Sequence, residues 1–260
     1  MKILKNEFNT VLSDNVKHYT IRPLQKLSHF ALTKVSGGKE NALLWSYGQF
    51  KLSPFLIIQG FLQGMYPIPN MNNAKIIDWY DPELRGTIPV QHFKIQKDLQ
   101  RRLKKEKFQE PGQKFEVRIN TNFKETIIAC SKPRGKKTKT WLTADYIKCA
   151  LELHQMGITH SVETYQNGVL VGGVVGIAIN GCFASLSLFH TVDNASKIAF
   201  YYLLVKLKED GFMLHDSGAA NSWFSQYGLV NMPKEEFRRN LILAIAAPVT
   251  FSNKVPELEF

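Results

Sequence analysis

The sequence predicts an α+β fold with a mostly antiparallel sheet, flanking helices and a small N-terminal α+β domain. The first observation is that residues 160–197 hold three apolar, β-rich runs and end in a helix start. Asn-Gly pairs separate these runs and favour tight hairpin turns, because both residues tolerate positive φ. The second observation is the element order of the second half, helix–strand–strand–strand–helix–strand–helix, which is typical of α+β proteins. The separating pairs are Asn167-Gly168 and Asn180-Gly181.

Local signals define the elements of the N-terminal part. Ser53 and Pro54 favour a helix start, as N-cap and first helical residue, and Gly64 favours its end. Aromatic and proline-rich turns are expected at residues 65–67 and 79–82. A domain boundary near residue 90 is expected, so that residues 1–90 form the small N-terminal domain and residues 91–260 the larger one.

Residues 93–108 predict an amphipathic helix with a strongly basic outer face. Ile95, Leu99 and Leu103 recur every fourth position, and Lys and Arg fill most of the remaining circumference. Strands are expected at residues 115–120 and 126–129.

A further helix is expected to begin after Thr143 as its cap and to end at Gly157. Beyond the hairpins, the sequence predicts a helix over 194–208, a strand over 212–215, and a loop with a short helix over 216–228. Another helix begins at Pro233, and the tail after Pro248 is expected to be peripheral.

Composition excludes several classes of protein. The 260 residues contain no apolar run of the ~18 residues that a membrane span needs. Three cysteines without CxxC spacing indicate neither a disulfide framework nor a zinc site. The N-terminal residues lack the apolar core of a signal peptide. We therefore expect a cytoplasmic protein, a monomer, without membrane, metal or cofactor.

The net charge of +11 is concentrated in residues 94–107 and 132–139. Clustered Lys and Arg are typical of proteins that bind a phosphate backbone, and a merely solvated helix face is the alternative. The candidate contacts to an RNA backbone are Lys97, Arg101, Arg102, Lys104 and Lys105.

The element order of the second half is also that of GNAT-like acyltransferases. Those enzymes hold the pyrophosphate of coenzyme A on a glycine-rich turn before a helix. Residues 192–197 (VDNASK) occupy that place here and contain no glycine. A helix start can still receive an anion, but acetyl-CoA is not expected, and the sheet is kept without its usual cofactor.

Six colinear stretches carry a resemblance to a known family. They are residues 42–67, 79–85 (WYDPELR), 140–143 (TWLT), 160–163 (HSVE), 170–173 (LVGG) and 189–197. In order and spacing they resemble the leucyl/phenylalanyl-tRNA–protein transferases, of which this chain looks like a divergent member. That family has a small N-terminal domain and a GNAT-like domain. The resemblance implies transfer of a leucyl or phenylalanyl group from aminoacyl-tRNA to the N-terminal α-amine of a protein that begins with Lys or Arg, marking it for degradation.

The resemblance also implies binding residues. The positions that match the family's aminoacyl pocket are Trp141, Val174, Leu188, Leu203 and Leu207. Leu186 would continue that apolar wall. Trp79 matches an aromatic residue near the terminal adenosine, and Asn194 and Ser196 at the helix start are further candidates for adenosine or tRNA contact. Plain core packing is the alternative for each pocket position.

The polar site departs from the family pattern. The family's Asp-Cys-Gln motif is Asp216-Ser217-Gly218 here, so the Asp is kept and the Gln is absent. Leu186 stands where the family has Glu, and Trp223 where it has His. Asp216 is therefore the candidate catalytic residue, which would orient the ammonium or relay its proton. The acceptor-side candidates are Ser217, Gly218 and Asn221.

Three hypotheses follow. The chain is an aminoacyl-tRNA–protein transferase with the family's acceptor, a tRNA-dependent aminoacyltransferase with a different acceptor, or a catalytically degenerate protein that binds charged tRNA. The pocket assignment carries a geometric requirement. If Val174 and Leu188 line one pocket, their hairpin needs one extra residue, in a three-residue turn or a bulge near residues 172–173. Leu186 and Leu188 are expected to share a face.

Overall fold

The structure is a computed structural model that describes residues 31–33, 43–47, 52–69, 77–106, 114–133, 140–219 and 221–258. A four-stranded antiparallel sheet has the order β1-β2-β4-β3. Its strands are β1 (Ala31–Thr33), β2 (Leu43–Tyr47), β3 (Tyr66–Pro69) and β4 (Ile77–Asp81), with helix α3 (Pro54–Leu62) between β2 and β3 in the chain.

The larger sheet has seven strands in the order β11-β5-β10-β9-β8-β7-β6. Within it only β9 and β10 pair in parallel, so the predicted α+β fold with a mostly antiparallel sheet is confirmed. The strands are β5 (Leu84–Ile88), β6 (Glu116–Ile119), β7 (Thr159–Gln166), β8 (Val169–Ile179), β9 (Cys182–His190), β10 (Leu214–Ala219) and β11 (Val230–Pro233). β5 precedes the boundary expected near residue 90 and is hydrogen-bonded within this sheet.

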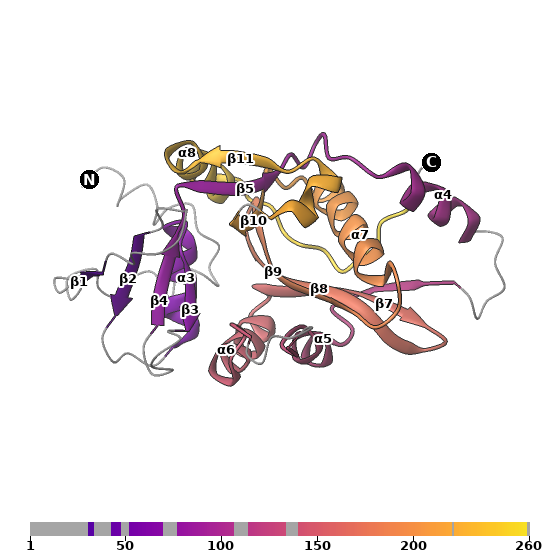
Figure 1. Ribbon diagram of the computed structural model, residues 1–260, viewed down its shortest axis with the longest axis horizontal. Coiled ribbons are helices and arrows are strands. Elements are labelled where there is room, and N and C mark those ends of the chain that lie inside the picture. The colour runs from indigo at the N-terminus through magenta and orange to yellow at the C-terminus, as the bar shows by residue number, and fades with distance from the viewer. Residues whose placement is uncertain are drawn as a thin grey trace.

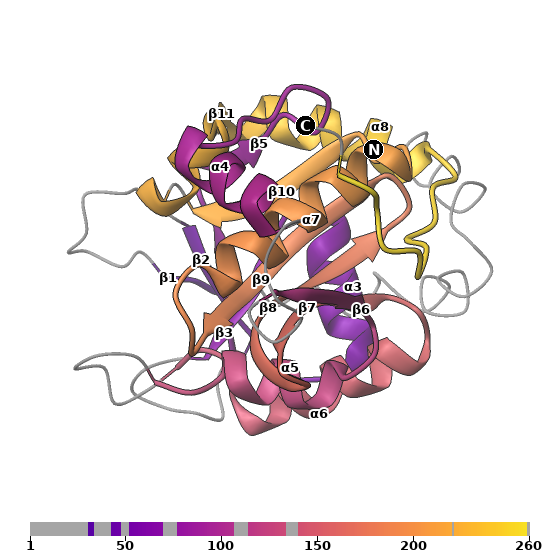
Figure 2. The same ribbon diagram turned by 90° about the vertical axis from the view of Figure 1, so that its right-hand side faces the viewer.

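Helices flank both faces of the large sheet (Figures 1 and 2). The helices α5 (Phe123–Cys130) and α6 (Ala144–Gln155) cover one face, and α7 (Ala195–Glu209) covers the other. Two further helices are α4 (Lys97–Glu106) and α8 (Lys234–Ala246), and a 3₁₀ turn spans Ser222–Tyr227. Each face buries its own hydrophobic core, one shared with α3, α5, α6 and α8 and the other with α4 and α7.

The helix caps and helix ends predicted from the sequence are confirmed. The Ser53 hydroxyl accepts a hydrogen bond from the Leu56 N–H at 3.3 Å, and Gly64 follows the helix with φ of +75°. Thr143 likewise caps α6, and Gly157 ends it with φ of +71°. Both Asn-Gly turns have positive φ at asparagine, as the hairpin prediction requires.

Several sequence predictions are wrong. Residues 126–129 lie in α5 rather than in a strand, because burial of one helix face against the sheet outweighs the β-branched run. The residues expected to form turns at 65–67 and 79–82 belong largely to β3 and β4. The tail is not peripheral, since Phe251 is buried and packs on Phe183 and Phe212.

The β8–β9 hairpin has the extra residue that the pocket assignment requires, at a different place. Ile179 pairs with Cys182 across a two-residue turn, and Val174 pairs directly with Leu188. The register shifts between Val175 and Gly176, where Leu186 has no partner, so Leu186 forms a β-bulge. As a result Leu186 packs in the core on the α5–α6 side and Leu188 in the core on the α7 side. The expectation that the two leucines share a face is wrong.

Candidate functional site

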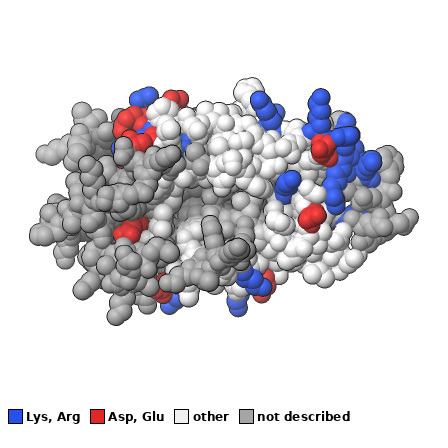
Figure 3. All heavy atoms as spheres, in the orientation of Figure 1, with Lys and Arg blue, Asp and Glu red and all other residues white. Residues whose placement is uncertain are grey.

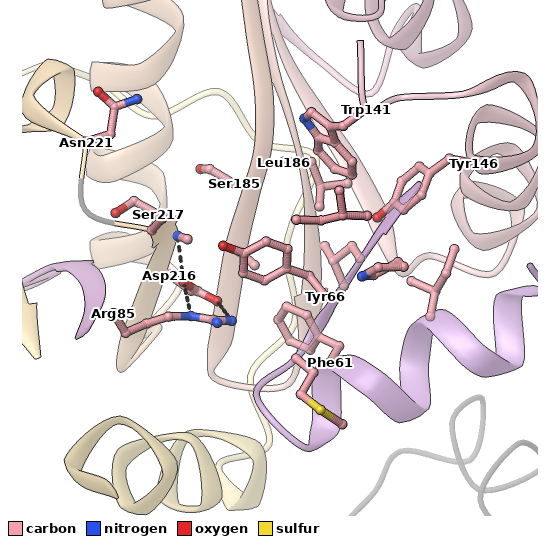
Figure 4. Close-up of a pocket in the computed structure, with 18 of the residues that line it drawn as sticks. Phe61, Tyr66, Arg85, Trp141, Tyr146, Ser185, Leu186, Asp216, Ser217 and Asn221 are labelled. Atoms are coloured by element: carbon pink, nitrogen blue, oxygen red, sulfur yellow. Dashed lines mark hydrogen bonds and ion pairs between the residues drawn. The ribbon is translucent and has the colours of Figure 1, made fainter. Parts of the chain in front are cut away.

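A cavity of about 560 Å³ lies between the N-terminal elements and inner strands of the large sheet. Helix α3 and strand β3 lie on one side of it, and strands β5, β9 and β10 lie on the other (Figure 4). Its apolar wall includes Phe61, Tyr66, Trp141, Tyr146 and Leu186. Its polar wall includes Arg85, Ser185, Asp216, Ser217 and Asn221.

The polar wall contains a buried ion pair between Arg85 and Asp216. The Arg85 Nε donates to Asp216 Oδ1 at 2.9 Å, and Arg85 Nη2 donates to Oδ2 at 2.7 Å (Figure 4). Both side chains are 3% exposed. This bidentate geometry is the strongest form of Arg–carboxylate pairing. It fixes the carboxylate plane and leaves the pair with no net charge.

Two aromatic rings pack against the Arg85 guanidinium. Its central carbon lies 4.7 Å from the Tyr66 ring centre and 4.6 Å from that of Phe237. Burial alone would lower the pKa of Arg85, but the adjacent Asp216 carboxylate raises that pKa above its ordinary value. Burial also raises the pKa of the Tyr66 hydroxyl, which therefore stays protonated at neutral pH.

The backbone after Asp216 completes the polar wall. Gly218 has φ of +80°, a value that favours glycine, and its N–H donates to Asp216 Oδ1 at 2.8 Å. The register of β10 against β5 shifts between Asp216 and Gly218. Among the described residues, Oδ1 accepts two hydrogen bonds and Oδ2 accepts one, which leaves one acceptor position on Oδ2.

The structure divides the residues predicted from the sequence into two groups. Trp141, Leu186, Asp216, Ser217, Gly218 and Asn221 line the cavity. The remaining aminoacyl-pocket candidates lie in the core on the α7 side of the sheet instead; they are Val174, Leu188, Leu203 and Leu207. The bulge at Leu186 separates the two groups, because it changes which face each β9 side chain meets.

The adenosine and tRNA candidates lie outside this cavity. Trp79 is 2% exposed and packs over Gly60 of α3. Asn194 precedes α7 in a left-handed conformation, and the Ser196 hydroxyl lies 3.1 Å from His190 Nδ1.

The basic candidates lie on α4, where Figure 3 shows Lys and Arg gathered at one end of the molecule. Leu99 and Leu103 are buried, as the amphipathic pattern predicts. Arg102 is half-buried and its guanidinium lies 5.5 Å from the Phe115 ring centre. The exposed members are Lys97, Arg101, Lys104 and Lys105, and Arg101 forms an ion pair with Asp98. In the second basic cluster, residues 134–139 lie outside the described residues.

Sequence reasoning missed Arg85, Tyr66, Ser185 and His215 as residues of this region. Arg85 ends the stretch WYDPELR, which was noted only for the family resemblance. Its partner Asp216 is 131 residues away in the chain, so no local spacing indicates the pair. No pattern in the sequence connects Ser185 with His215.

The described part of the chain has neither a metal-binding cluster nor a membrane-spanning helix. Those residues contain no group of three or more His, Cys, Asp or Glu side chains placed to hold a metal ion. None of the helices among them is long and apolar enough to cross a membrane.

Comparison with known proteins defines the class of this chain. Residues 87–242 match the family model of leucyl/phenylalanyl-tRNA protein transferases. A relative named leucyl/phenylalanyl-tRNA–protein transferase from Herpetosiphon aurantiacus is 35% identical over 77% of this chain and 98% of its own length. Relatives with the same name are found in Chlorobaculum tepidum (32% identity, 75% of this chain and 96% of theirs) and Saccharophagus degradans (36%, 73% and 74%).

The chain therefore belongs to the leucyl/phenylalanyl-tRNA–protein transferase family, as the resemblance predicted. Among solved structures, it is similar to the C-terminal domain of a putative lysylphosphatidylglycerol synthetase from Agrobacterium fabrum. The TM-score of that match is 0.39 at 13% identity, over 84% of this chain and 80% of the other.

Proposed function

We propose that this protein transfers a hydrophobic aminoacyl group, of the leucyl or phenylalanyl kind, from aminoacyl-tRNA to the N-terminal α-amine of a protein. One observation carries the proposal within this family. A single cavity joins an apolar aromatic wall, suited to a hydrophobic side chain, to a polar wall built around Asp216. Its volume of about 560 Å³ is within the range of small-molecule sites.

The reaction needs little covalent help from the protein. The amine nitrogen attacks the ester carbonyl, the ribose oxygen leaves with the electron pair of the broken bond, and one proton passes from nitrogen to oxygen. An N-terminal α-amine has a pKa of roughly 7.7–8.0, so part of it is neutral at pH 7. Holding this amine at the ester contributes up to about 7–11 kcal/mol through proximity. A rigid, dry cavity is the main requirement.

Asp216 orients the amine in this scheme. Its free Oδ2 position accepts a hydrogen bond from the amine N–H, while Arg85 and the Gly218 N–H hold the carboxylate in place. Because Arg85 neutralises the carboxylate, Asp216 orients the amine through a hydrogen bond and does not attract it through a net negative charge. Ser217 and Asn221, which line the same wall, bound the acceptor side with Gly218.

The donor side is proposed as follows. Trp141 and Leu186 contact the aminoacyl side chain, and the basic face of α4 contacts the tRNA backbone. Trp79, Asn194 and Ser196 remain candidates for contact with the terminal nucleotide. We also propose that the larger domain, with its boundary near residue 90, is GNAT-like, and that the protein acts as a cytoplasmic monomer.

A transfer assay tests the function directly. Purified protein is incubated with tRNA charged with labelled Leu or Phe and with a peptide that begins with Lys or Arg. The expected result is labelled peptide with the mass of one added amino acid. Loss of transfer in Asp216→Ala, measured at a temperature at which circular dichroism shows the variant to be folded, supports the role of Asp216.

The peptide panel must also include neutral first residues, because the carboxylate described in this cavity is already paired with Arg85. Transfer only to peptides whose first residue has a neutral side chain would favour the transferase with a different acceptor. An unaltered aminoacyl ester with every peptide, despite salt-dependent tRNA binding, would refute the enzyme and favour a binding protein.

A further inference from the structure

A serine–histidine pair lies at the polar wall of the cavity. The Ser185 side chain is half-buried and lines the cavity together with Ser217, Asn221 and Leu186 (Figure 4). The Ser185 Oγ lies 2.9 Å from Nε2 of His215, which is on the neighbouring strand β10. Neither residue has a part in the positioning of Asp216 described above.

His215 is enclosed in the core on the α7 side. His215 is 0% exposed, and the centre of its ring lies 6.3 Å from that of Phe183 and 5.4 Å from that of Phe200. Burial lowers the pKa of His215 to about 4, so the ring is neutral at pH 7. The ring therefore supplies one N–H donor and one bare nitrogen.

The tautomer of His215 sets the role of Ser185. The donor and acceptor in the contact between Ser185 Oγ and His215 Nε2 depend on which ring nitrogen carries the proton. His215 Nδ1 is buried and makes no hydrogen bond to another described residue, although an interaction with the backbone of His215 itself raises the pKa against the effect of burial. With the proton on Nε2, the ring donates to Ser185 Oγ and leaves the Ser185 hydroxyl hydrogen free to point into the cavity.

We propose that Ser185 is a catalytic proton shuttle for aminoacyl transfer and that His215 is its positioning residue. This inference rests on the proposed function. When His215 carries its proton on Nε2, Ser185 is a hydroxyl on the cavity wall with a free hydrogen and a free lone pair. It immediately precedes Leu186 in the chain, and both residues line the cavity.

The step is balanced without a charged intermediate on the protein. The amine nitrogen forms the C–N bond, and the bond from the carbonyl carbon to the ribose oxygen breaks. Ser185 Oγ takes the proton that nitrogen loses and passes its own hydroxyl hydrogen to the leaving oxygen. Ser185 ends as a neutral hydroxyl, and His215 stays neutral throughout, as its apolar surroundings require.

A covalent aminoacyl-Ser185 intermediate fits the site less well. A serine nucleophile needs a base that a third group orients, and no side chain among the described residues bonds to His215 Nδ1. The burial that lowers the pKa of His215 also makes it a weak base.

The test compares Ser185→Ala and His215→Leu with the matched control Ser187→Ala. Ser187 lies two residues further along β9, donates to the Cys130 carbonyl at 3.4 Å and does not line the cavity. Ser185→Ala is expected to lower kcat about 100-fold, with KM for tRNA and peptide changed less than about twofold. His215→Leu is expected to lower kcat by ~10-fold or more, and the double variant to be no slower than Ser185→Ala alone. Ser185→Thr, which keeps the hydroxyl, should restore most of the rate.

The outcomes separate this inference from the proposed function. If the wild type transfers no amino acid to any peptide of the panel, the proposed function fails. If the wild type transfers and folded Ser185→Ala is equally fast, the shuttle is refuted. Additive losses in the double variant would refute the positioning role of His215. An aminoacyl adduct on Ser185, found by mass spectrometry after rapid acid quenching, would overturn the shuttle in favour of a covalent route.

Discussion

Replacing Arg85 by Met should strongly destabilise the fold. The change removes the partner of the Asp216 carboxylate, which is 3% exposed and accepts two charge-assisted hydrogen bonds from Arg85. An unpaired charge in such a place costs about 3–5 kcal/mol. For a chain of this size each kcal/mol lowers Tm by roughly 2–4 °C, so the expected shift is roughly 6–20 °C. Asp216→Asn should also destabilise, because it leaves the guanidinium without its counter-charge.

The double variant Arg85→Met/Asp216→Asn tests the reason for this loss. Replacing a whole buried ion pair by uncharged side chains is often close to neutral. The double variant should therefore unfold at a higher denaturant concentration than Arg85→Met, which defines a favourable coupling in the double-mutant cycle.

Urea unfolding followed by circular dichroism measures all four proteins of this cycle. Losses below about 1 kcal/mol in both single variants would mean that water reaches the pair, since exposed ion pairs contribute that little. Strictly additive losses would show that the two side chains do not act as one unit. Either result would refute the account of the polar wall given above.

Three further predictions concern other parts of the molecule. Lys97→Glu/Lys105→Glu on α4 should weaken tRNA binding and reduce the slope of log Kd against log salt by roughly 0.9 per lost phosphate contact, whereas the exposed Lys148→Glu on α6 should not. Burial lowers the pKa of His160 to about 4. The contribution of neutral His160 to the free energy of unfolding is therefore fully present above the unfolded pKa of ~6.5 and is lost as pH falls towards 4, by about 3 kcal/mol in all. His160→Gln should flatten this part of the pH–stability curve, and an unchanged slope would contradict the assignment. Phe251→Ala should cost roughly 3–5 kcal/mol in urea unfolding, because its ring is 7% exposed; a loss below about 1 kcal/mol would show that the tail is dispensable.

The parts of the fold predicted from the sequence are those that local chemistry determines. Ser53 and Thr143 cap their helices through hydrogen bonds within three residues, and the Asn-Gly pairs turn two hairpins. Strands β3, β4, β5 and β11 were not predicted. They are four or five residues long, and β4, β5 and β11 each pair with a strand far away in the chain, so a short window of sequence contains little of the signal.

The candidate site was predicted in part for the same reason. Asp216 was identified through the family motif, and the structure places it on the cavity wall. Arg85 was missed, although it binds Asp216, because the two residues are joined only by the pairing of β5 with β10. Residues such as Leu203 and Leu207 are apolar at helical spacing, which describes a core face as well as a binding pocket, and here both are fully buried in the core.

The bulge at Leu186 explains why the polar wall has its present composition. Without it, strict alternation along β9 would place Leu186 and Leu188 on one face. With it, the pairing resumes at Ser187, so Leu186 faces the cavity while Leu188 remains in the opposite core. On the other side of the bulge, Ser185 is within hydrogen-bonding distance of His215 and also lines the cavity. One inserted residue thus places the Ser185 hydroxyl of the polar wall beside the Leu186 side chain of the apolar wall, which a regular alternation along the strand would not predict.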